Sequence, residues 1–185
     1  ITAGSNSIIL GGADQDSITA QGGTNTILGD NGTVERTGTA ITRVVTGDAG
    51  GATGDIDTIT VTGGTNTILG GVGGDTITVS GPSTNIILGD NGEVLVGTQV
   101  KTLDPTIGGV DHITTSDPTS VNTILGGAAG DIIQAPGGTN IILGDNGSVS
   151  LGGNITTTEP DTGGQDEITA GSNSIILGGA DQDSI

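Results

Sequence analysis

The chain has 185 residues, of which 38 are Gly, and it contains no Phe, Trp, Tyr, Met or Cys. Its 21 Asp and Glu residues against 3 Lys and Arg give a formal net charge of -18. Any core must therefore be narrow and built from Ile, Leu, Val and Ala, and the glycine content excludes helices. An acidic chain cannot neutralise phosphates, which excludes nucleic acid as a partner, whereas divalent cations are the natural complement of this charge.

The sequence repeats over a long distance. Residues 1–18 recur identically at 168–185, which places equivalent residues 167 positions apart. We interpret residues 1–185 as a single continuous segment of a longer array, namely one 167-residue super-repeat plus an 18-residue overlap. No charged, apolar leader precedes Ile1, and no apolar run reaches the roughly 18 residues that a spanning helix needs, so we expect no membrane insertion.

A shorter repeat lies inside this unit. Segments with Asp, such as DSIT from Asp16, alternate with segments with Asn, such as NTIL from Asn25, and the common step is nine residues. Two residues after the Asp or Asn that begins each of these segments, or after Ser7 and Ser174 at the two edges, stands an isoleucine. In chain order these are Ile9, Ile18, Ile27, Ile59, Ile68, Ile77, Ile87, Ile113, Ile124, Ile133, Ile142, Ile168, Ile176 and Ile185. Short β-branched strands between glycine turns predict an all-β fold, a parallel β-solenoid of about 18-residue coils with one Ile per strand pointing inward.

Three coils carry an insertion that opens with the same phrase, LGDNG, at residues 28–32, 88–92 and 143–147. The insertions, at about 33–54, 93–109 and 148–164, alternate with plain coils. Their sequences differ from one another, as expected of surface loops on a fixed scaffold.

A leucine follows each inward isoleucine on the Asn side. This leucine stripe consists of Leu10, Leu28, Leu69, Leu88, Leu125, Leu143 and Leu177. Adjacent strand residues face opposite ways, so the leucine stripe faces outward and needs a cover. Either the insertions provide it, with Val34, Val94, Leu95, Val149 and Leu151, or another chain packs there. We expect the insertions to cover much of the stripe and the remainder to mediate self-association.

The glycine turns carry a metal-binding pattern. Residues 70–78 read GGVGGDTIT, which fits G-G-x-G-x-D-x-U-x without a mismatch. Ca²⁺ takes about six to eight oxygen ligands, which Asp carboxylates and the carbonyls of tight glycine turns can supply. The chain resembles the hemolysin-type (RTX) calcium-binding repeat family over nearly all of its length apart from the insertions.

This resemblance implies a parallel β-roll outside the cell, Ca²⁺ as cofactor, and membership among toxins, proteases, S-layer proteins and giant bacterial adhesins. By motif, the implied ligands are Asp75, Asp16, Asp131, Asp183, Asp57, Asp111 and Asp166, with Asp14 at a turn position. The fourth motif position is Gly only at Gly73; Asp14, Ala129 and Asp181 stand there in related coils.

Two sets of residues keep alternatives open. The Asn row comprises Asn25, Asn66, Asn85, Asn122 and Asn140, and we interpret it mainly as a hydrogen-bonded amide ladder that satisfies the turn backbone. The aspartates of the LGDNG phrases are either further calcium ligands or form Asx turns at the start of the insertions; they are Asp30, Asp90 and Asp145. For the Asp row itself, the alternative to a metal site is simple turn chemistry.

We expect a structural protein and no enzyme. His112 is the only histidine and has no nucleophile arranged with it. The leading hypothesis is a calcium-stiffened repeat of a long secreted bacterial surface fibre or adhesin. The alternatives are an ice-binding β-solenoid, based on the column Thr19, Thr60, Thr78, Thr114 and Thr169, and a non-catalytic accessory module of a secreted polysaccharide-active enzyme.

Overall fold

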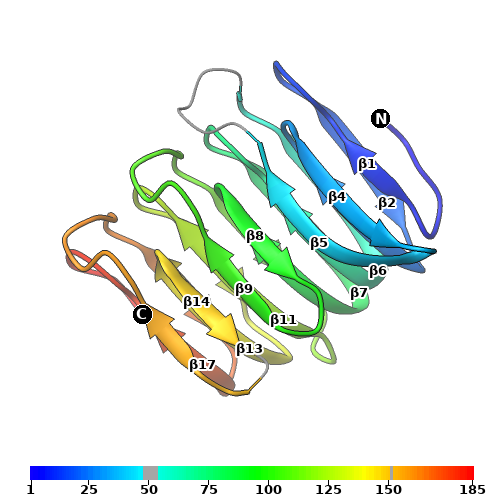
Figure 1. The fold of residues 1–185 in the computed structure, drawn as a ribbon. Coiled ribbons are helices and arrows are strands. Elements are labelled where there is room, and N and C mark those ends of the chain that lie inside the picture. Colours follow the sequence, from blue (N-terminus) through cyan, green and yellow to red (C-terminus); the bar gives the residue numbers. More distant parts are fainter. Residues whose placement is uncertain (48–53, 151) are drawn as a thin grey trace.

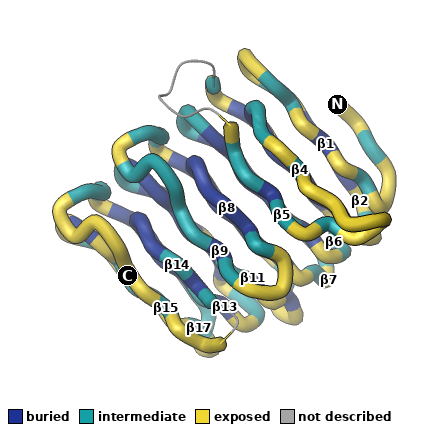
Figure 2. Tube along the Cα trace, in the orientation of Figure 1, coloured by how far each residue is buried: buried dark blue, intermediate teal, exposed yellow. Residues whose placement is uncertain are grey.

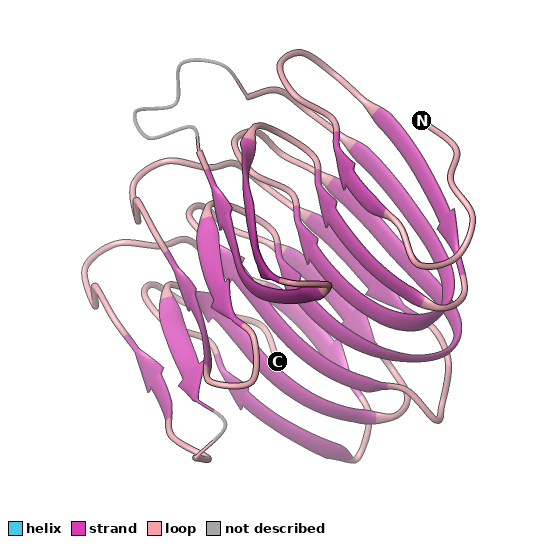
Figure 3. Ribbon diagram, turned by 45° about the vertical axis from the view of Figure 1, so that its right-hand side comes forward, coloured by secondary structure: helices cyan, strands magenta, loops and turns pink. Residues whose placement is uncertain are grey.

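The computed structural model describes residues 1–47, 54–150 and 152–185. These residues form β-strands and turns without a helix, and hence no helix long and apolar enough to cross a membrane. Leu151 of the predicted cover lies outside the described residues. The all-β class expected from the glycine and isoleucine pattern is therefore confirmed (Figure 3).

The larger sheet has eleven strands, which pair in parallel. Its strands are β1 (Ile8–Leu10), β2 (Ser17–Gln21), β3 (Thr24–Leu28), β6 (Thr58–Leu69), β7 (Thr76–Leu88), β10 (His112–Thr115), β11 (Val121–Gly127), β12 (Ile132–Ala135), β13 (Thr139–Asp145), β16 (Glu167–Ala170) and β17 (Asn173–Leu177). β6 and β7 each run through both an Asp segment and an Asn segment. We call one Asp-side strand and the Asn-side strand that follows it a coil.

The strand register stacks equivalent residues of successive coils. Ile9 lies beside Ile27, and Ile59 lies beside Ile77, each 18 residues later; across the first insertion Ile18 lies beside Ile59. These isoleucines, with smaller residues such as Val61 and Val79, form one buried core. Buried and less buried positions alternate along strands such as β10 and β12, as a sheet with one covered face requires (burial is drawn in Figure 2).

The three insertions build a second sheet. It has six antiparallel strands: β4 (Gly32–Thr37), β5 (Ala40–Thr46), β8 (Gly92–Leu95), β9 (Gln99–Thr102), β14 (Gly147–Ser150) and β15 (Ile155–Thr157). Each insertion is a hairpin, and successive hairpins pair with one another, β5 with β8 and β9 with β14. Figure 1 shows these strands side by side along the molecule.

The second sheet covers the leucine stripe. Leu28, Leu69, Leu88, Leu125 and Leu143 are fully buried in a second apolar cluster. Across from them lie Val44, Val94, Val100 and Val149. The prediction that the insertions cover the stripe is therefore confirmed, and Leu10, at 40% exposure, is the leucine of the stripe that stays exposed.

The geometry also explains why insertions alternate with plain coils. Strands in both sheets are about 4.8 Å apart, so a two-stranded hairpin spans two coils. The second sheet runs β4-β5-β8-β9-β14-β15, and the Asn-side strands run β3-β6-β7-β11-β13-β17. Each hairpin thus covers the coil that carries it and the plain coil that follows.

Candidate metal centre

One aspartate per coil forms a continuous column inside the large sheet. Each lies two residues before an inward Ile, so its side chain points the same way as the core. The Oδ1 atom of each accepts the backbone N–H of the Asp one coil earlier. The N–O distances are 2.7 Å for Asp16 to Asp57, 2.7 Å for Asp57 to Asp75, 2.6 Å for Asp75 to Asp111, 2.8 Å for Asp111 to Asp131, 2.7 Å for Asp131 to Asp166 and 3.1 Å for Asp166 to Asp183.

The second oxygen of the inner carboxylates has no hydrogen-bond partner. This holds for Oδ2 of Asp57, Asp75, Asp111, Asp131 and Asp166, whose residues are at most 1% exposed. Asp16 and Asp183, at the two ends of the column, are half-buried. A buried polar atom without a partner is costly, and more so when it carries charge, so these five oxygens require a proton or a cation.

Glycines make room for these oxygens. A Cβ at Gly70 would collide with Asp75 Oδ2 and with the carbonyl oxygen of Gly89. The same arrangement recurs at Gly126, where Asp131 Oδ2 and the Gly144 carbonyl occupy the space. Each coil therefore brings a carboxylate oxygen and a backbone carbonyl oxygen to one place, which is why the residue after the leucine must be Gly.

Burial raises the pKa of the column. Desolvation raises the pKa of Asp75 to about 8 and that of Asp131 to about 9, although the backbone N–H bonds oppose the shift. The pKa of Asp111 is also raised well above its ordinary value, first by desolvation and then by the charges of Asp131 and Asp75. Nearer the ends, desolvation raises the pKa of Asp57 to about 6 and that of Asp166 to about 7.

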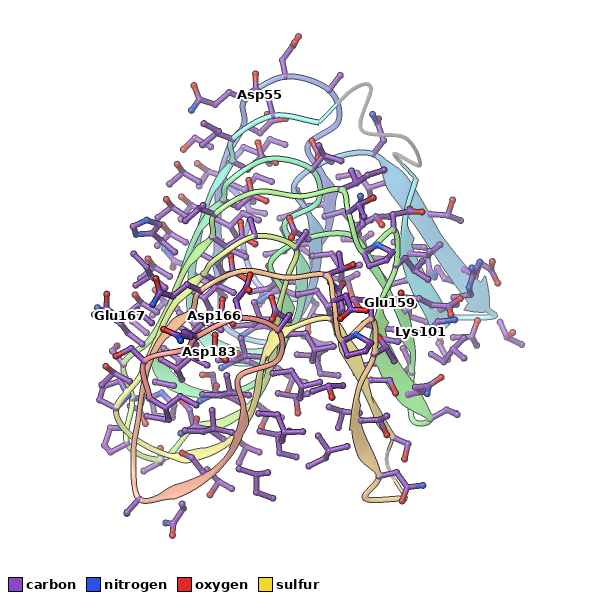
Figure 4. All side chains as sticks on the ribbon, turned by 90° about the vertical axis from the view of Figure 1, so that its left-hand side faces the viewer. Asp55, Lys101, Glu159, Asp166, Glu167 and Asp183 are labelled. Carbon is purple, nitrogen blue, oxygen red and sulfur yellow. The ribbon has the colours of Figure 1, made fainter. Side chains whose placement is uncertain are left out.

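The column fits a hard cation only with help from the backbone. Within the described ranges, no group of three or more His, Cys, Asp or Glu side chains converges as a metal site. An ion here would take carboxylate oxygens from the column and complete its coordination with carbonyl oxygens, which is chemistry that Ca²⁺ accepts. A cavity of about 380 Å³ lies beside Asp131 and Asp166 and is lined also by Gly130 and Gln165, although both aspartates are at most 1% exposed (Figure 4 labels Asp166 and Asp183).

The aspartates of the LGDNG phrases tie the hairpins to the coils. Asp90 accepts the N–H of Gly109, where its insertion returns, at 2.9 Å, and that of Ala128, in the next coil's turn, at 2.6 Å. In the same way, the Asp145 carboxylate accepts hydrogen bonds from the N–H groups of Gly164, at 2.8 Å, and Ala180, at 2.5 Å. The Asp30 carboxylate accepts one from the N–H of Val72 at 2.6 Å. These hydrogen bonds join residues 19 to 42 positions apart, so they fasten the end of an insertion or the next coil's turn to the point where the insertion begins.

Asp14 lies outside the column. It is exposed and has a φ of 66°, close to the 66° of Ala129 and the 65° of Asp181. Gly73, at the fourth motif position, has a φ of 111°. The turn thus needs a residue with a left-handed backbone conformation at this position, which explains the Gly of the motif. Ala129 adopts the same conformation at the cost of backbone strain.

The asparagines form an amide ladder on the opposite side. Nδ2 of Asn66 donates to Oδ1 of Asn85 at 2.9 Å, and Nδ2 of Asn85 donates to Asn122 at 2.7 Å. The row continues from Asn25 to Asn66 at 3.1 Å and from Asn122 to Asn140 at 2.8 Å. The predicted ladder is confirmed. Because an amide both donates and accepts, this column is satisfied without an ion.

One ionic cluster was missed by sequence reasoning. Glu93, 7% exposed on β8, pairs with Arg43 of β5 and, at 2.9 Å, with Lys101 of β9. Arg43 also contacts Glu35 at 2.7 Å. Hydrogen bonding to Lys101 and Arg43 lowers the pKa of Glu93. The cluster joins two hairpins, and no local sequence signal pairs residues 50 positions apart.

His112 lies exposed on the outer face of the large sheet, beside Thr76 and Ile132.

No protein-family model matches the chain, and no curated protein or solved structure matches it.

Proposed function

We propose that the chain is a unit of a β-solenoid rod with a structural role, whose aspartate column binds Ca²⁺. The observation that carries this proposal is the column of five buried carboxylates with an unpartnered Oδ2. The parallel register and the constant stacking of equivalent isoleucines support the solenoid. A narrow core flanked by the aspartate column and the asparagine ladder suits an extended rod better than an enzyme.

Calcium would act as a bridge between coils. Each Asp already joins two coils through its Oδ1, so an ion on Oδ2 would add a second link and neutralise the column. A metal that binds the folded chain only stabilises it by mass action, and a chain with a net charge of -18 gains most from losing self-repulsion. Folding would then depend on calcium, which is abundant outside cells, so we propose a secreted location for the chain.

Calorimetric titration tests the binding site. We expect Ca²⁺ to release or absorb heat on binding to the chain, and Mg²⁺ to compete poorly because it demands a smaller octahedral shell. The double variant Asp111→Asn with Asp131→Asn should lose most of this signal, whereas Asp14→Asn, on an exposed turn, should keep it. Equal binding by both variants would show that the column does not hold the ion.

Ice binding is the second candidate. The strand register aligns Thr19, Thr60, Thr78 and Thr114 on neighbouring strands of the outer face. The next position is Gln134, and the adjacent column contains Ile132 beside Glu167, so the row is interrupted. Thermal hysteresis in a folded sample would favour this function; its absence leaves the structural role.

A further inference from the structure

Successive hairpins of the second sheet meet in a junction with a constant chemistry. Between the first two hairpins, Val44 of β5 lies opposite Val94 of β8, and both belong to the second apolar cluster. Beside this pair, the N–H of Gly92 donates to the Oγ1 atom of Thr46 at 3.1 Å. The junction thus combines a buried aliphatic pair with a hydrogen bond from a glycine to a threonine.

The second and third hairpins repeat this junction. Val100 of β9 lies opposite Val149 of β14, and the N–H of Gly147 donates to the Oγ1 atom of Thr102 at 3.0 Å. Each junction joins the second strand of one hairpin to the first strand of the next. The first strand begins with Gly and has an aliphatic residue two positions later, and the second strand has an aliphatic residue two positions before a final Thr.

The two edge strands of the second sheet carry these same patterns. β4 begins with Gly32 and has Val34, whereas β15 has Ile155 and ends with Thr157. In the described part of the chain β4 pairs with β5 alone and β15 with β14 alone, and Figure 2 shows them at the two ends of the sheet. A β15 strand followed by a β4 strand would therefore make a third junction of the same kind.

The backbone of both edge strands is oriented for this junction. Gly47 donates to the carbonyl of Asn31 at 2.8 Å, which fixes the side of β4 that faces β5. Because N–H groups alternate sides along an antiparallel strand, the N–H of Val34 points away from β5. The equivalent bond from Thr158, also 2.8 Å, directs the N–H of Ile155 away from β14. Both edges thus present the aliphatic residue of the pattern in a hydrogen-bonding position.

The large sheet brings such strands together in an array. Residues 168–177 repeat the sequence of residues 1–10, so β17 is equivalent to β1. β1 pairs with β3, the strand that leads into β4, and β17 pairs with β13 and lies beneath the third hairpin. Where one strand has both roles, the β15 strand of one repeat and the β4 strand of the next lie over neighbouring strands, about 4.8 Å apart.

The leucine stripe agrees with this arrangement. Leu177 packs against the second apolar cluster together with Ile155, whereas the equivalent Leu10 is 40% exposed. In the described residues no strand of the second sheet lies over Leu10. A third hairpin from the preceding repeat would cover this leucine as it covers Leu177.

We propose that the β15 strand of each repeat pairs with the β4 strand of the next, so that the second sheet runs unbroken along the rod. Ile155 then lies opposite Val34, and Thr156 lies opposite Thr33. Glu35 falls opposite Asn154, so no like charges face each other. Two sheets hold neighbouring repeats together, and the leucine stripe is covered from repeat to repeat instead of mediating self-association.

The inference rests on the proposed rod and on the array that the recurrence of residues 1–18 at 168–185 indicates, and it does not rest on calcium. A chain of two repeats, residues 1–167 followed by residues 1–185, contains the junction once. The sequence has no cysteine, so disulfide formation can report on the junction. Thr33 and Thr156 are both exposed, which makes their replacement by cysteine mild.

The test variant carries Thr156→Cys in the first repeat and Thr33→Cys in the second. We expect an intramolecular disulfide, because directly opposite residues of such a pair have Cα atoms about 4.5 Å apart, within disulfide reach. The matched control carries the same two substitutions with the repeats exchanged, which places the cysteines at opposite ends of the rod. At about 10 μM chain the test variant should cross-link roughly a hundredfold faster than the control, because the effective concentration within a junction is about millimolar.

Far-UV circular dichroism of the same samples in calcium separates this inference from the proposed function. A chain that is rich in β-structure but cross-links no faster than the control would overturn the continuous second sheet and leave the rod intact. A chain without β-structure would overturn the rod, and the continuous sheet with it.

Discussion

Replacing Asp75 by Asn should change stability with opposite signs in the absence and presence of calcium. The amide oxygen keeps the 2.7 Å bond from the Asp57 N–H, so the backbone link between coils survives. Without calcium, the wild-type side chain is a fully buried group whose pKa is raised to about 8 by desolvation. Its ionised Oδ2 has no partner, whereas an Asn amide can donate to the nearby Gly89 carbonyl.

The expected size follows from the cost of an unsatisfied buried group, about 1–3 kcal/mol. In chelator at pH 8.5, Asp75→Asn should therefore raise the free energy of unfolding by about 2 kcal/mol. In saturating calcium the variant lacks one ligand, and the wild-type chain should be the more stable by a similar amount.

Urea unfolding followed by far-UV circular dichroism measures both differences, with sucrose added to every sample to favour the compact state in chelator. Asp14→Asn, which changes an exposed carboxylate outside the column, is the matched control and should shift neither curve. Destabilisation of Asp75→Asn in both conditions would mean that the carboxylate serves turn chemistry alone. Stabilisation in both would mean that no ion binds at this coil.

Other variants and conditions test the same structure. Asn85→Asp breaks the amide ladder at its donation to Asn122, so it should cost about 2–4 kcal/mol with or without calcium, as measured by urea unfolding. Leu88→Ala should lower stability by about 2–5 kcal/mol because Leu88 is fully buried, whereas Leu10→Ala should cost far less because Leu10 is 40% exposed. In chelator, stability should be greatest near pH 4 and fall as the pH rises through about 6 to 9, because the unfolded carboxyls lose their protons before the folded ones do. Calcium should suppress this decline, and a urea midpoint that rises with pH in chelator would contradict the buried column.

Local sequence patterns were enough to predict the two columns and the covered stripe. The step of nine residues, and the isoleucine two positions after each Asp and Asn of the two columns, set the strand register. They therefore also determine which side chains stack. Because Ile and Leu are adjacent in each strand, Leu28, Leu69 and Leu88 had to lie on the outer face. Proteins rarely leave a long apolar stripe exposed, so another part of the chain was expected to cover these leucines.

The arrangement of the insertions could not be predicted because it depends on contacts between distant residues. The hairpins differ in sequence, and their common sheet is built from pairs such as Val44 with Val94, 50 positions apart. For the same reason, local sequence does not decide whether Asp90 is a metal ligand or the maker of a local turn. Its partners, Gly109 and Ala128, lie in later parts of the chain and are brought close only by the stacking of coils.

The most direct test of the calcium-dependent rod is far-UV circular dichroism of the chain during a calcium titration from chelator at pH 8.5, with magnesium as control. We expect a disordered chain that becomes rich in β-structure on adding calcium and stays disordered with magnesium. A chain that is already rich in β-structure in chelator at this pH, and indifferent to calcium, would contradict the account, because its buried aspartates would then need no cation.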